Sequence, residues 1–137
     1  MKPERTSPTE RTLALYRKQG WQCAVVEKWN PYAKVRNDAF GFIDILAYHP
    51  FKKKIIGIQT TTMANKSNRI KKMAASQHTA GWNAAGGEIH LVVWRKLVSG
   101  WDADVLLFPY FLQKQTGEWV GSSEFGGSHG EIGRAHV

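Results

Sequence analysis

The stretch GFIDILAYHPFKKKIIGIQTTT, residues 41–62, decides the fold. Residues 41–49 and 54–62 are rich in isoleucine, aromatic residues and threonine, which favour β-strands. Between them, the residues from Pro50 to Lys53 form a short turn. Two strands joined by so short a turn pair in antiparallel fashion, so this stretch predicts a β-hairpin.

A helix and a further strand are predicted on the amino-terminal side of this hairpin. Ser7, Pro8 and Glu10 form the pattern of a capping box, with proline at the first helical position. After that helix, residues 21–29 (WQCAVVEKW) have the composition of a strand. The polar stretch 30–38, which contains a proline, is predicted to be a loop.

Residues 63–87 predict a helical segment after the hairpin. Ser67 is expected to cap it, because a serine side chain can accept a hydrogen bond from a free backbone N–H. Ile70 and Met73 lie on one apolar stripe at helical spacing. A break near Ser76 is expected to divide the segment or end its first helix.

Two more strands complete the predicted sheet. Residues 88–97 form an apolar run, and the crossover from 54–62 through a helix predicts a parallel, right-handed connection. Residues 103–114 predict a last strand, which Pro109 restricts to an edge or a bulge. Edge strands invite pairing with another chain, so a homodimer through this strand is expected.

The chain of 137 residues has the size of one domain. We predict an α/β fold of the mixed α+β kind over residues 1–120, in which a central mixed sheet of about four or five strands is flanked by two helices. Residues 121–137 are rich in glycine and serine and lack periodicity. They are predicted to be a flexible tail.

The charge of the chain favours an anionic partner. Lysine and arginine number 19 against 11 acidic residues, which gives a net charge of +8. No acidic residue occurs between Asp44 and Glu88. Such a one-sign segment predicts a basic face for nucleic acid, DNA in the first place. The residues expected to contact phosphates are Lys53, Lys54, Lys66, Arg69 and Lys71.

Several classes of protein are excluded by what the sequence lacks. The single cysteine, Cys23, cannot form an internal disulfide, which fits a reducing cytoplasm. No stretch approaches the ~18–20 apolar residues that a membrane span requires. The sequence has no Walker-type phosphate loop, no G-x-S-x-G motif and no H-E-x-x-H motif.

Asp44 is the first candidate for a functional residue. It lies between two isoleucines, where an ionised carboxylate is costly unless it meets a cation or strong donors. On the neighbouring strand, Gln59 and Thr61 share one face by the period-2 rule. Gly57 lies on that same face and leaves room for a ligand. The structural alternative is that Asp44 accepts hydrogen bonds from the backbone or from Arg36.

The chain resembles the PD-(D/E)XK nuclease superfamily, which includes Holliday-junction resolvases and the VRR-NUC group. The resemblance rests on the predicted order of elements, which is helix, three strands, helix and strand, and on two short motifs. The family's first motif, an aspartate shortly after a glycine on the second strand, matches Gly41 to Asp44. Its second motif, a carboxylate, any residue and a lysine, falls on Gln59-Thr60-Thr61. The resemblance implies a restriction-endonuclease-like αβββαβ core and Mg²⁺-dependent hydrolysis of phosphodiester bonds.

The sequence departs from the family pattern at the metal ligands and at the lysine. Gln59 supplies a neutral amide where the family has a carboxylate, and Thr61 cannot carry the charge of the lysine. The alternatives for a second carboxylate are Asp38, Glu27 and Glu10. The alternatives for the lysine are Lys72, Lys71 and Arg69. We expect Mg²⁺ to be held by Asp44, Gln59 and Asp38. The expected catalytic set is Asp44, Gln59, Thr61 and Lys72.

Three functions follow from this pattern. The first is a nucleic-acid-binding protein that acts as a metal-dependent endonuclease or resolvase with an altered active site. The second is a catalytically inactive module that binds DNA or RNA, which the missing glutamate and lysine favour. The third is an oligomeric accessory or interaction protein from a mobile element, in which the positive charge serves solubility.

Two tryptophans at the ends of the strand 21–29 have two interpretations. Trp21 and Trp29 either pack in the core or, if exposed beside a basic face, stack on nucleic-acid bases. Core packing is the more common role of tryptophan in a small domain.

Overall fold

The helices and strands largely follow the order that the sequence predicts. The computed structural model describes residues 6–108 and 131–136. In chain order, the elements are α1 (Pro8–Lys18), β1 (Gln22–Val25), β2 (Lys28–Asn30), β3 (Val35–Asn37), β4 (Ile45–His49), β5 (Lys54–Thr62), a short 3₁₀ turn η1 (Met63–Asn65), α2 (Lys66–Ala75), α3 (Gln77–Ala84), β6 (Glu88–Leu97), β7 (Gly100–Phe108) and β8 (Glu131–His136).

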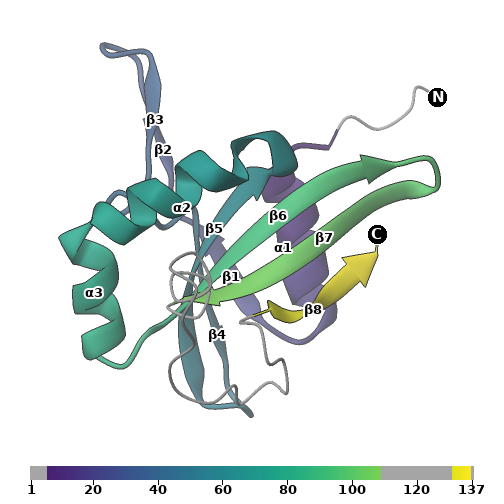
Figure 1. Cartoon of the computed structure of the whole chain (residues 1–137). Helices are drawn as coiled ribbons and strands as arrows, with labels where there is room; N and C mark the ends of the chain where they lie inside the picture. The colour runs from purple at the N-terminus through teal and green to yellow at the C-terminus, as the bar shows by residue number, and fades with distance from the viewer. Residues whose placement is uncertain (1–5, 109–130, 137) are drawn as a thin grey trace.

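The main sheet is mixed and has the strand order β1-β4-β5-β6-β7-β8 (Figure 1). The pairs β1–β4 and β4–β5 are antiparallel, which confirms the predicted hairpin of residues 41–62. β5 and β6 are parallel, as a crossover through α2 and α3 requires. A separate two-stranded sheet contains β2 and β3. The predicted mixed α/β class is therefore confirmed.

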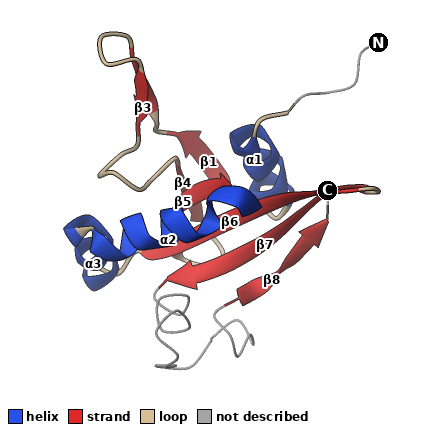
Figure 2. Cartoon of the chain, turned by 45° about the horizontal axis from the view of Figure 1, so that its top comes forward, coloured by secondary structure: helices blue, strands red, loops and turns tan. Residues whose placement is uncertain are grey.

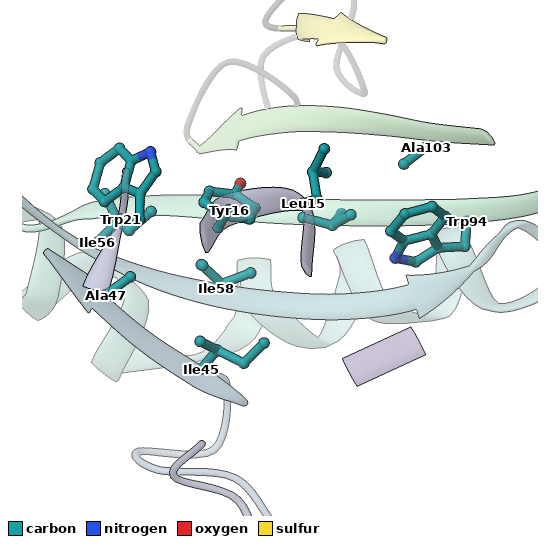
Figure 3. Packing of buried hydrophobic residues seen from close by; sticks show 10 residues of the cluster. Leu15, Tyr16, Trp21, Ile45, Ala47, Ile56, Ile58, Trp94 and Ala103 are labelled. Atoms are coloured by element: carbon teal, nitrogen blue, oxygen red, sulfur yellow. The ribbon is translucent and has the colours of Figure 1, made fainter. Parts of the chain in front are cut away.

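The sheet is covered on both faces. One core cluster joins Leu15 and Tyr16 of α1 to the face of the sheet that carries Ile45, Ile58 and Trp94 (Figure 3). The other cluster contains the apolar side chains Phe42, Ile43, Ile70, Met73, Leu91 and Val93. Alternate residues of β6 thus point to opposite faces, as period-2 geometry demands. α1 covers one face and α2 the other (Figure 2).

The capping box of α1 is confirmed. The Ser7 hydroxyl accepts a hydrogen bond from the Glu10 backbone N–H at 3.1 Å, and the Ser7 backbone N–H donates to the Glu10 carboxylate at 2.9 Å. The break near Ser76 is confirmed too, since its hydroxyl caps α3 by accepting from the His78 backbone N–H. Ser67 is not a cap, because η1 leads directly into α2 at Asn65.

The region 21–38 differs from the prediction. The strand expected over residues 21–29 is divided into β1 and β2, and the expected loop over 30–38 contains β3. The chain leaves the main sheet after Val25, and the Val26 N–H donates to the Asp44 carbonyl at 2.9 Å. β2 and β3 then pair with each other and project from the body of the molecule (Figures 1 and 2).

Gly57 does not leave an open space for a ligand. A Cβ atom at that position would come within 3.0 Å of the Ile43 side chain. The glycine instead allows Ile43 and Phe42 to pack closely against β5.

The carboxyl-terminal part of the sheet concerns the expected last strand and the expected flexible tail. β7 is hydrogen-bonded to both β6 and β8, and the homodimer stays a prediction. Pro109 and residues 110–114 of the expected last strand lie outside the described residues. Of the expected flexible tail, residues 121–130 and 137 lie outside them as well, and residues 131–136 form β8. Within the described ranges, no helix is long and apolar enough to cross a bilayer.

Candidate metal and phosphate site

A pocket of about 580 Å³ opens beside the start of α1, the base of the β2–β3 hairpin and one face of α2. Asp44, which lies just before β4, and Gln59, in the middle of β5, both line it. The remaining lining residues are Ser7, Pro8, Thr9, Glu10, Val25, Glu27, Arg36, Asp38, Thr60, Arg69 and Lys72. The structure therefore brings together residues from six separate segments of the chain.

Three carboxylates meet in this pocket. Glu27 follows β1, Asp38 follows β3 and Asp44 precedes β4, and one carboxylate oxygen from each lies within 4.8 Å of the others. We call Glu27, Asp38 and Asp44 the acidic cluster. Two of them flank the β2–β3 hairpin, because Glu27 directly precedes β2 and Asp38 directly follows β3. Pairing of the hairpin strands therefore brings these two acids together.

Asp44 is the most buried member of the acidic cluster, with 3% of its surface exposed. The Gln59 side-chain amide donates to Asp44 Oδ2 at 2.5 Å, and the Thr60 backbone N–H donates to the same oxygen at 2.9 Å. Burial raises the pKa of Asp44 to about 8, and the hydrogen bond with Asp38 contributes to the rise. The Thr60 N–H opposes the shift only in part. Asp44 thus keeps its proton to a much higher pH than an exposed aspartate does.

Gln59 presents an unused acceptor beside this carboxylate. The side chain is 1% exposed, and its Oε1 atom has no hydrogen-bond partner among the residues that the structure describes. A buried amide oxygen without a donor is costly, so such an atom points to a missing positive partner. Together with the acidic cluster it forms an oxygen-only ligand set, which suits a hard cation such as Mg²⁺.

Two cations of α2 lie across the pocket from these acids. Arg69 and Lys72 are three residues apart, so they project from the same side of the helix, and both line the pocket. Of the alternatives for the missing lysine, the structure therefore places Lys72 and Arg69 at the site. Lys71 is exposed and is not part of the lining.

Other expected site residues lie away from the pocket. Thr61 is buried next to Thr60 and is not part of the lining, and its hydroxyl has no hydrogen-bond partner among the residues that the structure describes. Lys66 lies in the first turn of α2, outside the lining. Lys53 and Lys54 line a different pocket, and Lys54 pairs with Glu88 at 2.8 Å. Lys54 lies five residues before Gln59 on β5, which puts it about 17 Å from the site.

The pocket also includes residues that the sequence pattern did not single out. Thr9 donates its hydroxyl proton to Glu27 at 3.2 Å, and Arg36 lies 3.7 Å from the same carboxylate. Thr60 contacts the Asp44 carboxylate through its backbone N–H, and no pattern of residue types in the sequence predicts a backbone contact. Arg36 was considered only as a partner of Asp44, whereas the structure pairs it with Glu27.

A buried polar chain fixes α1 against β5 behind the site. The Thr12 hydroxyl lies 3.0 Å from the Thr60 hydroxyl and accepts a hydrogen bond from the Trp94 indole N–H at 3.0 Å. Thr60 is the residue whose backbone N–H contacts Asp44. The start of α1, and with it the edge of the pocket near Glu10, is held to the strand that carries Gln59.

Comparisons of this chain with protein-family models, with curated proteins and with solved structures found no match. A function is therefore argued from the chemistry of the pocket and from the charges around it.

Proposed function

We propose that this chain binds nucleic acid and hydrolyses phosphodiester bonds with a divalent cation, as a PD-(D/E)XK-like nuclease with an altered active site. The observation that carries the proposal is the meeting, in one pocket, of the acidic cluster and Gln59 on one side with Arg69 and Lys72 on the other. Metal-assisted hydrolysis of a phosphodiester needs acidic ligands for the cation and positive groups for the phosphate.

Asp44, Asp38, Glu27 and the Gln59 amide oxygen would hold the cation. When bound, Mg²⁺ supplies a water of lowered pKa and neutralises charge on the phosphate. Asp44 must give up its proton to become a ligand, so cation binding is expected to release a proton below a pH of about 8. Gln59 would turn from a donor toward Asp44 into an oxygen ligand by rotating its amide.

Lys72 and Arg69 would contact the phosphate. Lys72 would supply the positive charge that Thr61 does not, from the helix instead of from the strand. The guanidinium of Arg69 can donate two parallel hydrogen bonds to phosphate oxygens. Lys66 and Lys71 extend the positive charge along α2, and α2 contains no acidic residue. Binding of such a surface to DNA weakens steeply with salt, because each phosphate contact releases counterions.

A cleavage assay tests this proposal. Supercoiled plasmid and a labelled oligonucleotide are incubated with Mg²⁺ or Mn²⁺ and either the wild type or Asp44→Asn. We expect Asp44→Asn to lower the rate by at least about 10- to 100-fold, as the loss of groups at a metal site commonly does. Lys53→Ala, which removes a lysine outside the pocket, should leave the rate unchanged. Equal rates for the wild type and Asp44→Asn would contradict a catalytic role.

A second function is favoured by the residues at positions 59 and 61. Glutamine and threonine replace the carboxylate and the lysine of the family motif, and Thr61 does not reach the pocket. A module that binds DNA or RNA without cutting it has no need of either group. Salt-dependent binding without cleavage under any divalent cation would identify it. Either function fits the cytoplasmic location that the sequence led us to expect.

A further inference from the structure

The β2–β3 hairpin is an arm that stands on the edge of the pocket. It forms its own two-stranded sheet and projects from the body of the molecule in both views (Figures 1 and 2). Its two ends are held at the acidic cluster by Glu27 and Asp38. Whatever the base of the arm contacts therefore lies next to the candidate cation site.

The arm carries aromatic rings and positive charges and no acidic residue. Trp29 is 56% exposed and Tyr32 is 96% exposed, and neither belongs to a core cluster. The cations within residues 28–37 are Lys28, Lys34 and Arg36. Exposed rings among cations are the surface that single-stranded nucleic acid recognises, because bases stack on the rings and phosphates meet the cations.

The register of the arm places one of these rings beside a residue of the pocket. Trp29 on β2 is the cross-strand partner of Arg36 on β3, so the two side chains share one face of the hairpin. Arg36 also lines the pocket. A base stacked on Trp29 would thus place its own phosphate near the guanidinium of Arg36, on the path to Arg69 and Lys72.

The tip of the arm is held in shape by Asn30. Its side-chain oxygen accepts hydrogen bonds from the backbone N–H groups of Tyr32 at 2.9 Å and Ala33 at 3.1 Å. Its backbone carbonyl accepts from the Lys34 N–H at 2.7 Å. Lys34 adopts a φ of 56°, a left-handed conformation that is uncommon for lysine. A tip organised in this way presents Tyr32 with little loss of entropy on binding.

We propose that the arm stacks on unpaired bases, and that the preferred substrate is nucleic acid with a single-stranded segment. This inference rests on the proposed function, since it names the substrate of the same pocket. We favour nucleic acid over an apolar partner because the exposed rings lie on the same arm as Lys28, Lys34 and Arg36, and Arg36 also lines the pocket with Arg69 and Lys72.

The test compares two labelled DNAs by fluorescence anisotropy with Ca²⁺ in place of Mg²⁺. One is a blunt duplex, and the other is the same duplex with a single-stranded extension. Wild-type protein is expected to bind the extended DNA at least about 5- to 150-fold more tightly, the range that one base–aromatic stack provides. Trp29→Ala and Tyr32→Ala should each remove most of this preference, and Trp29→Phe should keep much of it.

Phe51→Ala is the matched control. Phe51 is 89% exposed and lies beside Lys52 and Lys53 in the β4–β5 turn, so it is an exposed aromatic among lysines outside the arm. Its loss should leave the preference for the extended DNA intact. Thermal unfolding of each variant shows that a lost preference is not a lost fold.

The possible outcomes distinguish a failure of the stacking arm from a failure of the proposed nucleic-acid function. If the wild type binds both DNAs equally, or if Trp29→Ala keeps the preference, the stacking arm is wrong while the proposed function stands. If neither DNA binds at low salt, both are wrong. Binding of vesicles that contain phosphatidylserine, dependent on Trp29, without preference for the extended DNA would overturn the inference in favour of a membrane-contacting arm.

Discussion

Asp44 is the residue on which the site depends, and its protonation links the site to the stability of the fold. Its pKa of about 8 lies above the ordinary value of 3.8, chiefly because the carboxyl is buried and because Asp38 and Glu27 lie beside it. Between these two pH values the folded protein holds a proton that the unfolded chain has lost. The folded state is therefore favoured at low pH and loses this advantage as pH rises.

We predict that the free energy of unfolding falls as pH rises from about 4 to about 8, with a slope of up to ~1.4 kcal/mol per pH unit from this group. Asp44→Asn mimics the protonated form and should flatten that part of the profile. Urea unfolding at several pH values, without divalent cations, measures the slope for both proteins. An identical slope in Asp44→Asn would show that the carboxyl does not titrate in this way.

Individual site residues were predictable only where a local pattern constrains them. The apolar neighbours of Asp44 and the alternation of β5 were enough to select Asp44 and Gln59. The same alternation selected Thr61, which shares the face but does not reach the pocket. Asp38 was an expected metal ligand, whereas Glu27 was only an alternative for the second carboxylate. The pairing of β2 with β3, which brings the two acids together, has no local signal because β3 lies in a stretch that predicts a loop.

At the scale of single elements, only one face of α2 borders the pocket, and that face carries Arg69 and Lys72. Lys71 and Lys72 are neighbours in sequence, yet only Lys72 lines the pocket. Successive residues of a helix point about 100° apart, so the two lysines serve as a matched pair.

We predict that Lys72→Ala lowers the rate of DNA cleavage by about 100-fold, as the loss of one group that stabilises a transition-state charge does. Lys71→Ala should change the rate little and only weaken binding in a salt-dependent way. Single-turnover rates at saturating protein separate the two effects. Equal losses in the two variants would mean that α2 acts only as a charged surface.

The contact between α1 and β5 depends on the Thr12 hydroxyl. We predict that Thr12→Val, which keeps the shape of the side chain, lowers the free energy of unfolding by ~1–3 kcal/mol. The Trp94 N–H then loses its acceptor and the Thr60 hydroxyl loses a neighbour in the core. When Thr12→Val is made in the Trp94→Phe variant, it should lower the free energy of unfolding by less, because that variant has no indole N–H to lose its acceptor. Equal costs in both backgrounds would show that this hydrogen bond contributes nothing.

Predictions of elements failed where the chain changes partners. Residues 21–29 have a uniform strand composition, so no local signal marks the point after Val25 where the chain leaves the main sheet for the hairpin arm. By contrast, the capping box at Ser7 and the break at Ser76 depend on side chains close in sequence, and both were confirmed. Lys53 and Lys54 were expected to contact phosphates because they belong to the segment without acidic residues, although a hairpin turn lies a full strand length from the strand ends.

At the scale of the whole molecule, two strand pairings and their directions were predictable because their connections allow few alternatives. The short turn after β4 enforces an antiparallel pair, and the helical crossover between β5 and β6 allows a parallel one. β8 was not predicted, because it lies in the stretch 121–137, which is rich in glycine and serine and lacks the alternation of a strand. The net charge of +8 predicted a basic surface, and the fold concentrates part of it on α2 beside an acidic pocket.

The central claim is that Asp44 and Gln59 hold a divalent cation. Crystals soaked in Mn²⁺ above pH 8, where Asp44 has lost its proton, test it by anomalous diffraction. We predict a peak at about 2.0–2.3 Å from an oxygen of Asp44 and from Gln59 Oε1, with Asp38 or Glu27 completing the ligand set. A pocket without a peak, in which Asp44 and Gln59 still contact each other, would contradict the claim.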